Sequence, residues 1–455
     1  MGGGGMEGLQ VLRFCLGLLL LCSSMVQIGF CESLEDIPAI QRFREYLRIP
    51  TVHPDPDYAP AIEFLTRQAE EIGLPVTIHQ LVEYKPILVM TWEGSEPSLK
   101  SIMLNSHMDV VQCDLDEWIC DPFAAYMDED GNIFGRGTQD MKGMAMHYLE
   151  AIRILKQKDF KPVRTIHVVF VPDEEIGGEA GWKGFIETAE FRAMNVAIAL
   201  DEGPISTDNS SYYATWAEKS PWWLIIKAIG PTGHGSVFFD GSALENLFKS
   251  VESISRFRES QMLLVKAGEP LGEVVTVNGV FLQAGTKSST GYTMNVQPAE
   301  AEAGFDIRVP PYSEVAEALD KRISEEWAPC SRNLTFWFEQ KFETEDGQPP
   351  ITGIDGSNPW WGLLKKSLGK FNGPLIPEIC PASTDMRFLR QKGFAAFGFS
   401  AIQGAPVLIH DDNEFVNGWK WLEGIPVFAE VIETYASFSD PDREADTQDL
   451  LTDTQ

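Results

Sequence analysis

Ile102-Met103-Leu104-Asn105-Ser106-His107-Met108-Asp109 is the stretch around which the rest of the chain is organised. Its first half is apolar, which is typical of a buried β-strand, and a histidine and a carboxylate stand at its end. Side chains alternate faces along a strand, so His107 and Asp109 are expected to point the same way. Open α/β sheets carry their chemistry at the carboxyl ends of strands, which makes this pair a candidate site. Alone it is weak, because such a pair more often stabilises structure than binds a metal.

The chain on both sides of this strand alternates between helical and strand patterns. Apolar residues recur at helical spacing over 58–74 and again from Ala145 to Leu155. The sequence therefore predicts an α/β domain with a central sheet buried on both faces. Short apolar runs favour its strands at 76–81, 87–92, 101–106, 165–171 and 195–201.

The order of the predicted elements changes near Ser220. Strands at 222–229, 274–282, 301–309 and 334–338 alternate with helices at 244–254 and 313–327, which is the β-α-β-β-α-β order of ferredoxin-like domains. After a linker at 347–350, helices near 360–368 and 422–438 and a strand at 395–398 follow. The 455 residues exceed what one core usually organises. We predict a discontinuous α/β domain of residues 33–218 and 345–439, an inserted α+β domain of residues 219–344, and a disordered acidic tail of residues 440–455.

The composition is acidic, with 67 Asp and Glu residues against 36 Lys and Arg and a net charge of -31. Such a chain repels phosphate backbones and anionic lipid surfaces, which argues against nucleic acid as a partner. Most of the surplus carboxylates are expected to form a solvated surface. Only those at particular spacings are candidate ligands.

Residues 1–32 differ from the rest of the chain and are predicted to be a signal peptide. Arg13 precedes an apolar run, 14–22, that is too short to span a bilayer. An uncleaved amphipathic or membrane anchor is the alternative. The glycosylation triplets at Asn209 and Asn333 agree with secretion into the endoplasmic reticulum lumen, a vacuole or the extracellular space rather than a cytoplasmic location. After signal cleavage we expect no membrane attachment.

Beyond the leader the sequence holds Cys113, Cys120, Cys330 and Cys380. An even number permits disulfides in an oxidising compartment, and Cys113 with Cys120 would close a short loop. No Cys-x-x-Cys pair occurs in the sequence. A cysteine-based zinc site or a thioredoxin-like motif is therefore not indicated.

Carboxylates stand at further points where apolar runs and helices meet. Asp140 lies in the glycine-rich stretch 135–143 ahead of a helix, where tight bends would aim its side chain, although an acid there is ordinarily a helix cap. Asp173-Glu174-Glu175 follows the strand at 165–171 and precedes two glycines. Adjacent carboxylates repel each other unless a cation holds one of them. Glu175 is thus a candidate ligand and Glu174 a candidate proton acceptor.

Two more groups complete this set. Glu202 follows the strand at 195–201, and His410 follows a fourth apolar run at 406–409. If the ends of these four apolar runs converge in one fold, they bring two histidines among several carboxylates. That donor set suits a pair of zinc ions, with one carboxylate bridging and an open position for water.

These motifs, in this order, resemble those of the co-catalytic zinc aminopeptidase, carboxypeptidase and aminoacylase family over about residues 35–438. The resemblance is greatest to the family's aminoacylases, the N-acyl-amino-acid amidohydrolases. It implies a zinc-exopeptidase-like catalytic domain, with the inserted ferredoxin-like domain as a lid and dimerisation domain. The segments that carry the resemblance are His107-x-Asp109, Gly137–Lys142, Asp173–Gly178, Ala199–Gly203, Leu408–Asp411, Ser220–Trp223 and Asn358–Trp361.

The resemblance also implies a role for each motif residue. Two Zn²⁺ ions would be bound, one by His107, Asp140 and Glu202, the other by Asp140, Glu175 and His410, with Asp140 bridging. Asp109 would hydrogen-bond the His107 ring and fix its tautomer. Glu174 would be the general base that moves a proton from water to the leaving amine.

Three residues of the inserted domain are implied to meet the substrate. His234 would reach into the neighbouring subunit's site and steady the oxyanion. Asn295 and Arg308 would meet the substrate's carboxylate or the tetrahedral intermediate, although Arg308 is equally well explained as a salt bridge on a strand face. The remaining histidines match no motif, and we expect them to be structural or on the surface: His53, His79, His147 and His167.

The predicted function is hydrolysis of N-acyl-L-amino acids to a carboxylate and a free amino acid by a homodimer. A carboxypeptidase or dipeptidase with the same metals is the rival within the family. Hydrolases of auxin-type amino-acid conjugates are less similar, because their Cys-Gly-His stretch has no counterpart here. A metal-bound but inactive binding protein is the rival outside the family, and the presence of Glu174 speaks against it. The predicted signal peptide departs from the family pattern, because the family's aminoacylases are commonly cytosolic.

Overall fold

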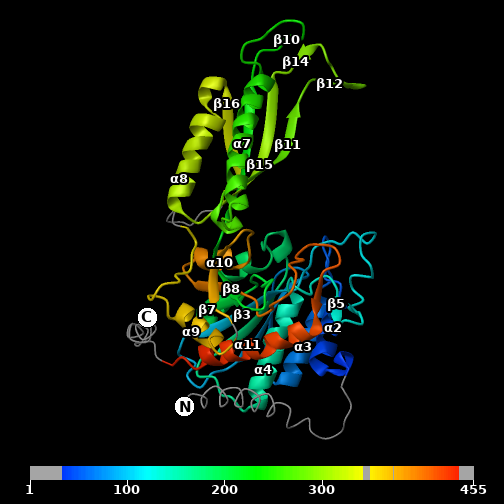
Figure 1. Cartoon of the computed structure of the whole chain (residues 1–455), viewed down its shortest axis with the longest axis vertical. Helices are drawn as coiled ribbons and strands as arrows, with labels where there is room; N and C mark the ends of the chain where they lie inside the picture. Colours follow the sequence, from blue (N-terminus) through cyan, green and yellow to red (C-terminus); the bar gives the residue numbers. More distant parts are fainter. Residues whose placement is uncertain (1–32, 342–348, 372, 440–455) are drawn as a thin grey trace, which may run out of the picture.

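The computed structural model describes residues 33–341, 349–371 and 373–439 (Figure 1). The predicted signal peptide of residues 1–32 and the acidic tail of residues 440–455 lie outside the described residues. The described chain forms a larger unit with the N- and C-terminal segments, and a smaller elongated unit that stands above it (Figure 1). Among the helices of these ranges, none combines the length and apolar character needed to cross a bilayer.

The larger unit is built on a mixed sheet, which confirms the predicted α/β class. Its central neighbours β6, β3, β7 and β18 run parallel, so their carboxyl ends meet at one edge. Within the described residues the strands of this sheet lie side by side in the order β1 (Val76–Val82), β2 (Lys85–Trp92), β6 (Ile166–Val171), β3 (Ser101–His107), β7 (Val196–Asp201), β18 (Ala395–Phe399), β8 (Tyr212–Glu218) and β17 (Leu375–Cys380).

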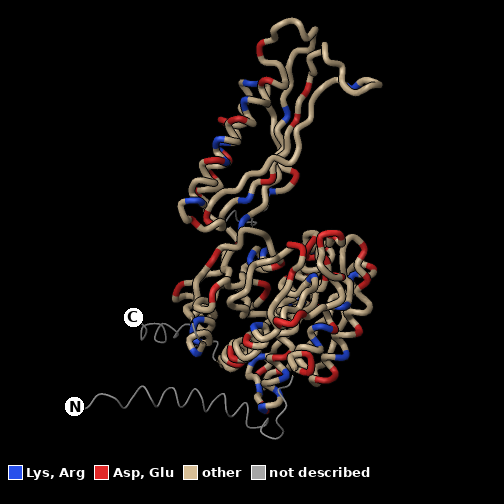
Figure 2. The backbone as a smooth tube through the Cα atoms, turned by 45° about the vertical axis from the view of Figure 1, so that its right-hand side comes forward, with Lys and Arg blue, Asp and Glu red and all other residues tan. Residues whose placement is uncertain are grey.

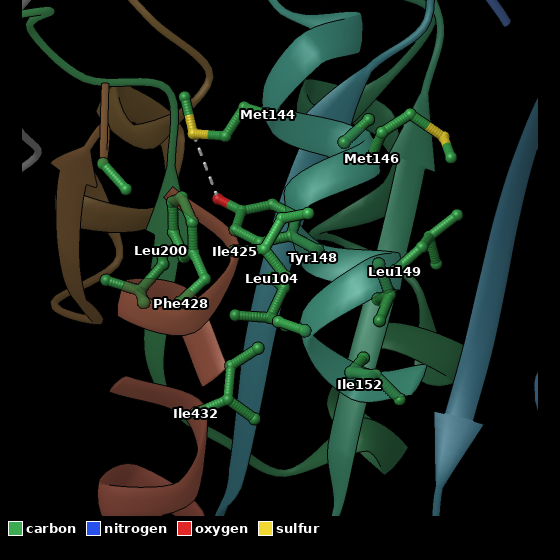
Figure 3. Packing of buried hydrophobic residues seen from close by; sticks show 14 of the residues in the cluster. Leu104, Met144, Met146, Tyr148, Leu149, Ile152, Leu200, Ile425, Phe428 and Ile432 are labelled. Atoms are coloured by element: carbon green, nitrogen blue, oxygen red, sulfur yellow. Dashed lines mark hydrogen bonds between the residues drawn. The ribbon is translucent and has the colours of Figure 1, made fainter. Parts of the chain in front are cut away.

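Helices cover both faces of this sheet. On one face Leu104 and Leu200 of the strands meet Tyr148 of α4 and Phe428 of α11, all fully buried (Figure 3). Burying side chains of this size stabilises the fold by about 1.5–3 kcal/mol each. This face is covered by α2 (Pro38–Leu47), α3 (Ala59–Ile72), α4 (Lys142–Gln157), α9 (Pro359–Leu368) and α11 (Gly418–Ala436), and the other by α5 (Trp182–Phe185), α6 (Ala189–Met194) and α10 (Met386–Gln391).

A small antiparallel sheet joins two distant parts of the chain near the carboxyl edge. Its strands are β4 (Tyr126–Met127), β5 (Asn132–Phe134) and β19 (Phe415–Asn417). The pairing of β5 with β19 places the segment just before Asp140 beside the segment just after His410. Residues some 270 positions apart thereby become neighbours at the candidate site.

The smaller unit has its own core and its own four-stranded sheet among the described residues. The main elements follow the predicted β-α-β-β-α-β order, and both acidic and basic residues lie along its helices (Figure 2). Short strands β10 (Gly233–His234), β12 (Lys287–Ser288), β13 (Gly291–Tyr292) and β14 (Val296–Gln297) lie at its far end (Figure 1). Its main elements are β9 (Ser220–Ile229), α7 (Ala243–Lys266), β11 (Thr276–Ala284), β15 (Glu300–Val309), α8 (Ser313–Arg322) and β16 (Leu334–Lys341).

The helix predicted over 313–327 is present, although at Ile323 it changes from an α-helix into a π-helical turn that ends at Trp327. The run at 406–409 is not a strand but a loop that ends in a turn at His410. The sequence left open whether Cys113 and Cys120 form a bridge; in the structure all four cysteines of the described residues are free thiols. Short 3-10 turns lie at η1 (Leu34–Asp36), η3 (Leu271–Glu273) and η5 (Cys330–Arg332).

Candidate metal centre

The carboxyl edge of the sheet gathers all five predicted metal ligands. Their donor atoms form two groups, each within 4.8 Å: His107, Asp140 and Glu202, and Asp140, Glu175 and His410. Asp140 belongs to both groups. His107 ends β3, Glu202 follows β7 directly, and Glu175 lies in the 3-10 turn η2 (Glu174–Ile176) after β6. The parallel strands therefore position three of the five donors, while Asp140 precedes helix α4 and His410 lies in a loop.

The contacts place Asp140 at the centre of the two groups. Its Oδ1 lies 2.9 Å from His107 Nε2, and its Oδ2 lies 3.2 Å from His410 Nε2. His410 Nε2 also lies 3.0 Å from Glu175 Oε2. Each oxygen of Asp140 thus faces the histidine of a different group. This is the arrangement that a bridging carboxylate needs.

His410 reaches this cluster from a loop rather than from a strand end. The side chain of Gln139 takes the place of a neighbouring strand, since its Oε1 accepts from the Leu408 N–H at 2.8 Å and its Nε2 donates to the Pro406 carbonyl at 3.0 Å. His410 itself has a positive φ of 64°. The sequence interpretation took the apolar run at 406–409 for the end of a strand. Its main-chain groups bond to the Gln139 side chain instead of to a neighbouring strand.

The loop that carries Asp140 is organised by Glu414, a residue that no sequence motif marked. Its fully buried carboxylate accepts from the N–H groups of Gly137 at 3.0 Å, Gln139 at 2.6 Å and Asp140 at 3.3 Å. Arg136 Nη1 pairs with it at 3.0 Å. Gly137 has a φ of 94°, a conformation that favours glycine. The Glu414 carboxylate thus holds the backbone bent around Asp140, the residue that both donor groups share.

Glu414→Gln is expected to lower the free energy of unfolding by about 3 kcal/mol, because Arg136 is left buried without its counter-charge. The variant is also expected to retain less metal, because the Asp140 loop loses its charged acceptor. Urea unfolding and metal analysis measure the two effects. The matched control is Glu423→Gln, since Glu423 forms an exposed pair with Lys420, and it should change stability by no more than about 0.5 kcal/mol. An unchanged unfolding energy for Glu414→Gln would contradict its role in the loop.

Asp109 has a different set of contacts from the one predicted. Its main-chain carbonyl, not its carboxylate, lies within hydrogen-bond distance of His107 Nδ1, at 2.9 Å against 3.6 Å for Oδ1. The carboxylate instead accepts from the N–H groups of Glu174 at 3.2 Å and Glu175 at 3.0 Å, and meets His53 Nε2 at 2.8 Å. Asp109 therefore orients the His107 ring through its backbone and the η2 turn through its side chain.

His53 was expected to be structural or on the surface, and it is a buried residue that contacts this carboxylate. Donor atoms of His53, Asp109 and Asp173 also lie within 4.8 Å of one another. Lys85 Nζ, however, pairs with Asp173 at 2.8 Å, and the Tyr58 hydroxyl donates to the same oxygen at 2.8 Å. An ammonium group already supplies the cation at this third cluster, so we assign no metal to it.

The electrostatics of the site show an excess of buried negative charge. Burial, and then the neighbouring Asp385, raise the pKa of Glu174 well above its ordinary value. Burial and Asp140 do the same to the pKa of Glu202. Burial also opposes ionisation of Asp140, but hydrogen bonds from His107 and His410 outweigh it and hold the pKa of Asp140 low. Hydrogen bonds to Asp140 and Glu175 raise the pKa of His410 to about 10.

This donor set fits divalent metal ions. Within the described residues, Glu175 Oε1 is buried without a hydrogen-bond partner. Such an atom is costly unless a cation meets it. Histidine nitrogens and carboxylate oxygens are the ligands of zinc and similar ions.

The predicted substrate residues do not join the metal ligands of their own chain. His234 and Asn295 lie together at the far end of the smaller unit, where the Gly235 N–H donates to the Asn295 carbonyl at 2.8 Å (Figure 1). Arg308 lies on β15 at the near end: its Nε pairs with Asp306 at 2.8 Å and its Nη1 lies 3.5 Å from Ser383 Oγ of the larger unit. Arg308 thus forms a salt bridge with Asp306 on its own strand, and its side chain also faces the larger unit.

The comparisons with known proteins agree with this fold. The model of peptidase family M20/M25/M40 matches residues 103–435. Aminoacylase-1 of Dictyostelium discoideum is 42% identical over 409 residues, which cover 88% of this chain and 98% of the relative. Aminoacylase-1 of Homo sapiens is 39% identical over 408 residues, covering 89% and 96%. The solved structure of an M20 family metallo-carboxypeptidase from Sulfolobus solfataricus shares the fold, with a TM-score of 0.64 at 17% identity over 88% of this chain and 99% of that one. The chain therefore belongs to peptidase family M20/M25/M40.

Proposed function

We propose that this protein is a dinuclear zinc hydrolase that cleaves the amide bond of N-acyl-L-amino acids to a carboxylate and a free amino acid. Its family and its aminoacylase-1 relatives make it a metal-dependent hydrolase. The observation that supports the finer assignment is the pair of donor groups that share Asp140, with Glu174 beside them. A single bridging carboxylate between two groups suits two ions better than one.

In this proposal His107, Asp140 and Glu202 hold one zinc ion, and Asp140, Glu175 and His410 hold the other. When bound, such a pair of ions makes water more acidic and polarises an amide carbonyl. Asp109 fixes the orientation of the His107 ring through its main-chain carbonyl and the position of the η2 turn through its carboxylate. The ligands are thereby fixed before substrate arrives, which lowers the reorganisation needed during reaction.

Glu174 is the general base in this mechanism. It accepts a proton from the attacking water as the new carbon–oxygen bond forms, and it donates that proton to the amine nitrogen as the carbon–nitrogen bond breaks. Burial and acidic neighbours raise the pKa of Glu174. A carboxylate with a raised pKa is a stronger base, which suits both steps.

We further propose that residues 219–344 act as a lid and dimerisation domain. His234 and Asn295 lie at the end of this segment that is remote from the metal ligands of the same chain (Figure 1). Exposed apolar side chains lie within four residues of them in the sequence, among them Phe238 and Met294. This supports delivery of His234 to the site of a neighbouring subunit in a homodimer, with Arg308 meeting substrate from the base of the lid. Secretion is a separate proposal, which rests on the sequence of residues 1–32.

A carboxypeptidase or dipeptidase remains the rival activity, and substrate profiling separates the two. We expect N-acetylmethionine and other N-acetyl amino acids to be hydrolysed faster than free dipeptides by the purified protein. Chelator should abolish turnover, and zinc added back should restore it. Release of free amino acid, measured over a panel of both substrate classes, tests the proposal. Faster cleavage of dipeptides, or turnover that survives complete metal removal, would contradict it.

A further inference from the structure

Arg387, on helix α10, faces the turn that carries Glu174 and Glu175. Its Nη1 lies 3.7 Å from Glu174 Oε1, and its Nη2 donates to the Gly177 carbonyl at 2.9 Å. Only 7% of the residue is exposed. The η2 turn is itself closed by the Gly177 N–H, which donates to the Glu174 carbonyl at 2.8 Å. One guanidinium therefore contacts both the backbone of the turn and the side chain that the turn presents.

The guanidinium is held from behind by a buried polar network. Its Nη1 donates to the Thr384 carbonyl at 2.7 Å. The Thr384 hydroxyl donates to Glu218 Oε1 at 3.3 Å, and Arg390 Nη1 donates to the same oxygen at 2.6 Å. The Arg387 guanidinium also lies over the Phe388 ring, 4.5 Å from its centroid. These contacts fix the orientation of the planar Arg387 guanidinium, which faces Glu174.

The charge of Arg387 offsets a repulsive neighbour. Both carboxylate oxygens of Asp385 are buried and have no hydrogen-bond partner among the described residues. Asp385 and Glu174 repel each other, and Arg387 attracts both. Without the Arg387 guanidinium, repulsion by Asp385 would move the Glu174 carboxylate out of its position. At 3.7 Å the ion pair is too long for a hydrogen bond, so the Glu174 oxygens stay available to accept a proton.

We propose that Arg387 is a positioning residue that holds Glu174 in its reactive orientation, through the Gly177 carbonyl and the ion pair with the Glu174 carboxylate. The inference rests on the proposed role of Glu174 as general base. A displaced base costs about 10²-fold in rate, because proton transfer depends steeply on geometry. An alternative is a purely structural ion pair, whose loss would lower stability without a specific effect on Glu174.

The test combines Arg387→Met with Glu174→Gln. Arg387→Met is expected to lower kcat by about 10²-fold with KM changed by less than about threefold, and with zinc content retained. Arg387→Lys keeps the charge but not the planar fork, so an intermediate loss is expected, and it serves if the methionine variant does not fold. The control is Arg192→Met, since Arg192 is exposed and donates to the Glu187 carbonyl at 2.8 Å, and it should leave kcat unchanged.

The double variant separates positioning from general destabilisation. If Arg387 acts through Glu174, adding Arg387→Met to Glu174→Gln changes kcat by less than about twofold. A full multiplication of the two losses would overturn the inference, and so would wild-type kcat in both Arg387→Met and Arg387→Lys. Wild-type activity in Glu174→Gln alone would instead overturn the proposed base. The two failures are thus distinguishable.

Discussion

Glu174→Gln is expected to keep zinc and fold normally, yet to lose about 3 kcal/mol or more of transition-state stabilisation, about 10²–10⁴-fold in kcat. The amide has nearly the shape of the carboxylate but cannot accept the proton of the attacking water. Glu174 belongs to neither donor group, and its backbone N–H still reaches Asp109, so the ligand set should remain intact. The loss should therefore appear in kcat and not in metal content.

Turnover of N-acetylmethionine and zinc content are measured on the same preparation of this variant. The matched control is Glu179→Gln, five residues along the chain, where the acid forms an exposed pair with Lys183. That control should behave as wild type, because exposed pairs contribute little. Wild-type turnover in zinc-loaded Glu174→Gln would rule out the general-base assignment. Loss of zinc from the variant would place Glu174 among the ligands instead.

The central strands could be predicted from sequence because burial on both faces leaves continuous apolar runs. The runs that became β3, β6 and β7 show this pattern, and their observed bounds differ by a residue or so from those expected. The strands β8 (Tyr212–Glu218) and β17 (Leu375–Cys380) were missed. β17 lies at the edge of the sheet and contains Pro377 and Glu378, so neither an apolar run nor a regular alternation marks it.

The members of the two donor groups could be predicted for a similar reason, since all but His410 stand at the end of a strand or at the start of a helix. Glu414 could not, because its role is defined by its approach to a loop about 275 residues earlier in the chain. His53 and Arg387 likewise act through contacts that only the folded chain creates: the Asp109 carboxylate and the Gly177 carbonyl. Local sequence encodes the donors, whereas long-range packing selects the groups that orient them.

Restoration of activity in hybrid dimers is the second large effect that we expect. His234→Ala should lower kcat by about 10²–10³-fold, the loss typical of removing one donor to an oxyanion. His107→Ala should be inactive because it lacks a metal ligand. In a mixed dimer, the His234→Ala chain keeps an intact metal site and receives His234 from its His107→Ala partner. One of two sites is then complete, so a random mixture should recover about a quarter of wild-type activity.

The position of His234 is the physical reason for this expectation. It lies on β10 at the end of the smaller unit that is remote from the metal ligands of its own chain (Figure 1). Differently tagged chains allow the heterodimer to be isolated and its turnover of N-acetylmethionine measured. Pairing His234→Ala with a chain that carries both substitutions is the control, and it should recover nothing because neither site is complete. An inactive, verified heterodimer of the two single variants would mean that His234 acts within its own chain or has no part in the reaction.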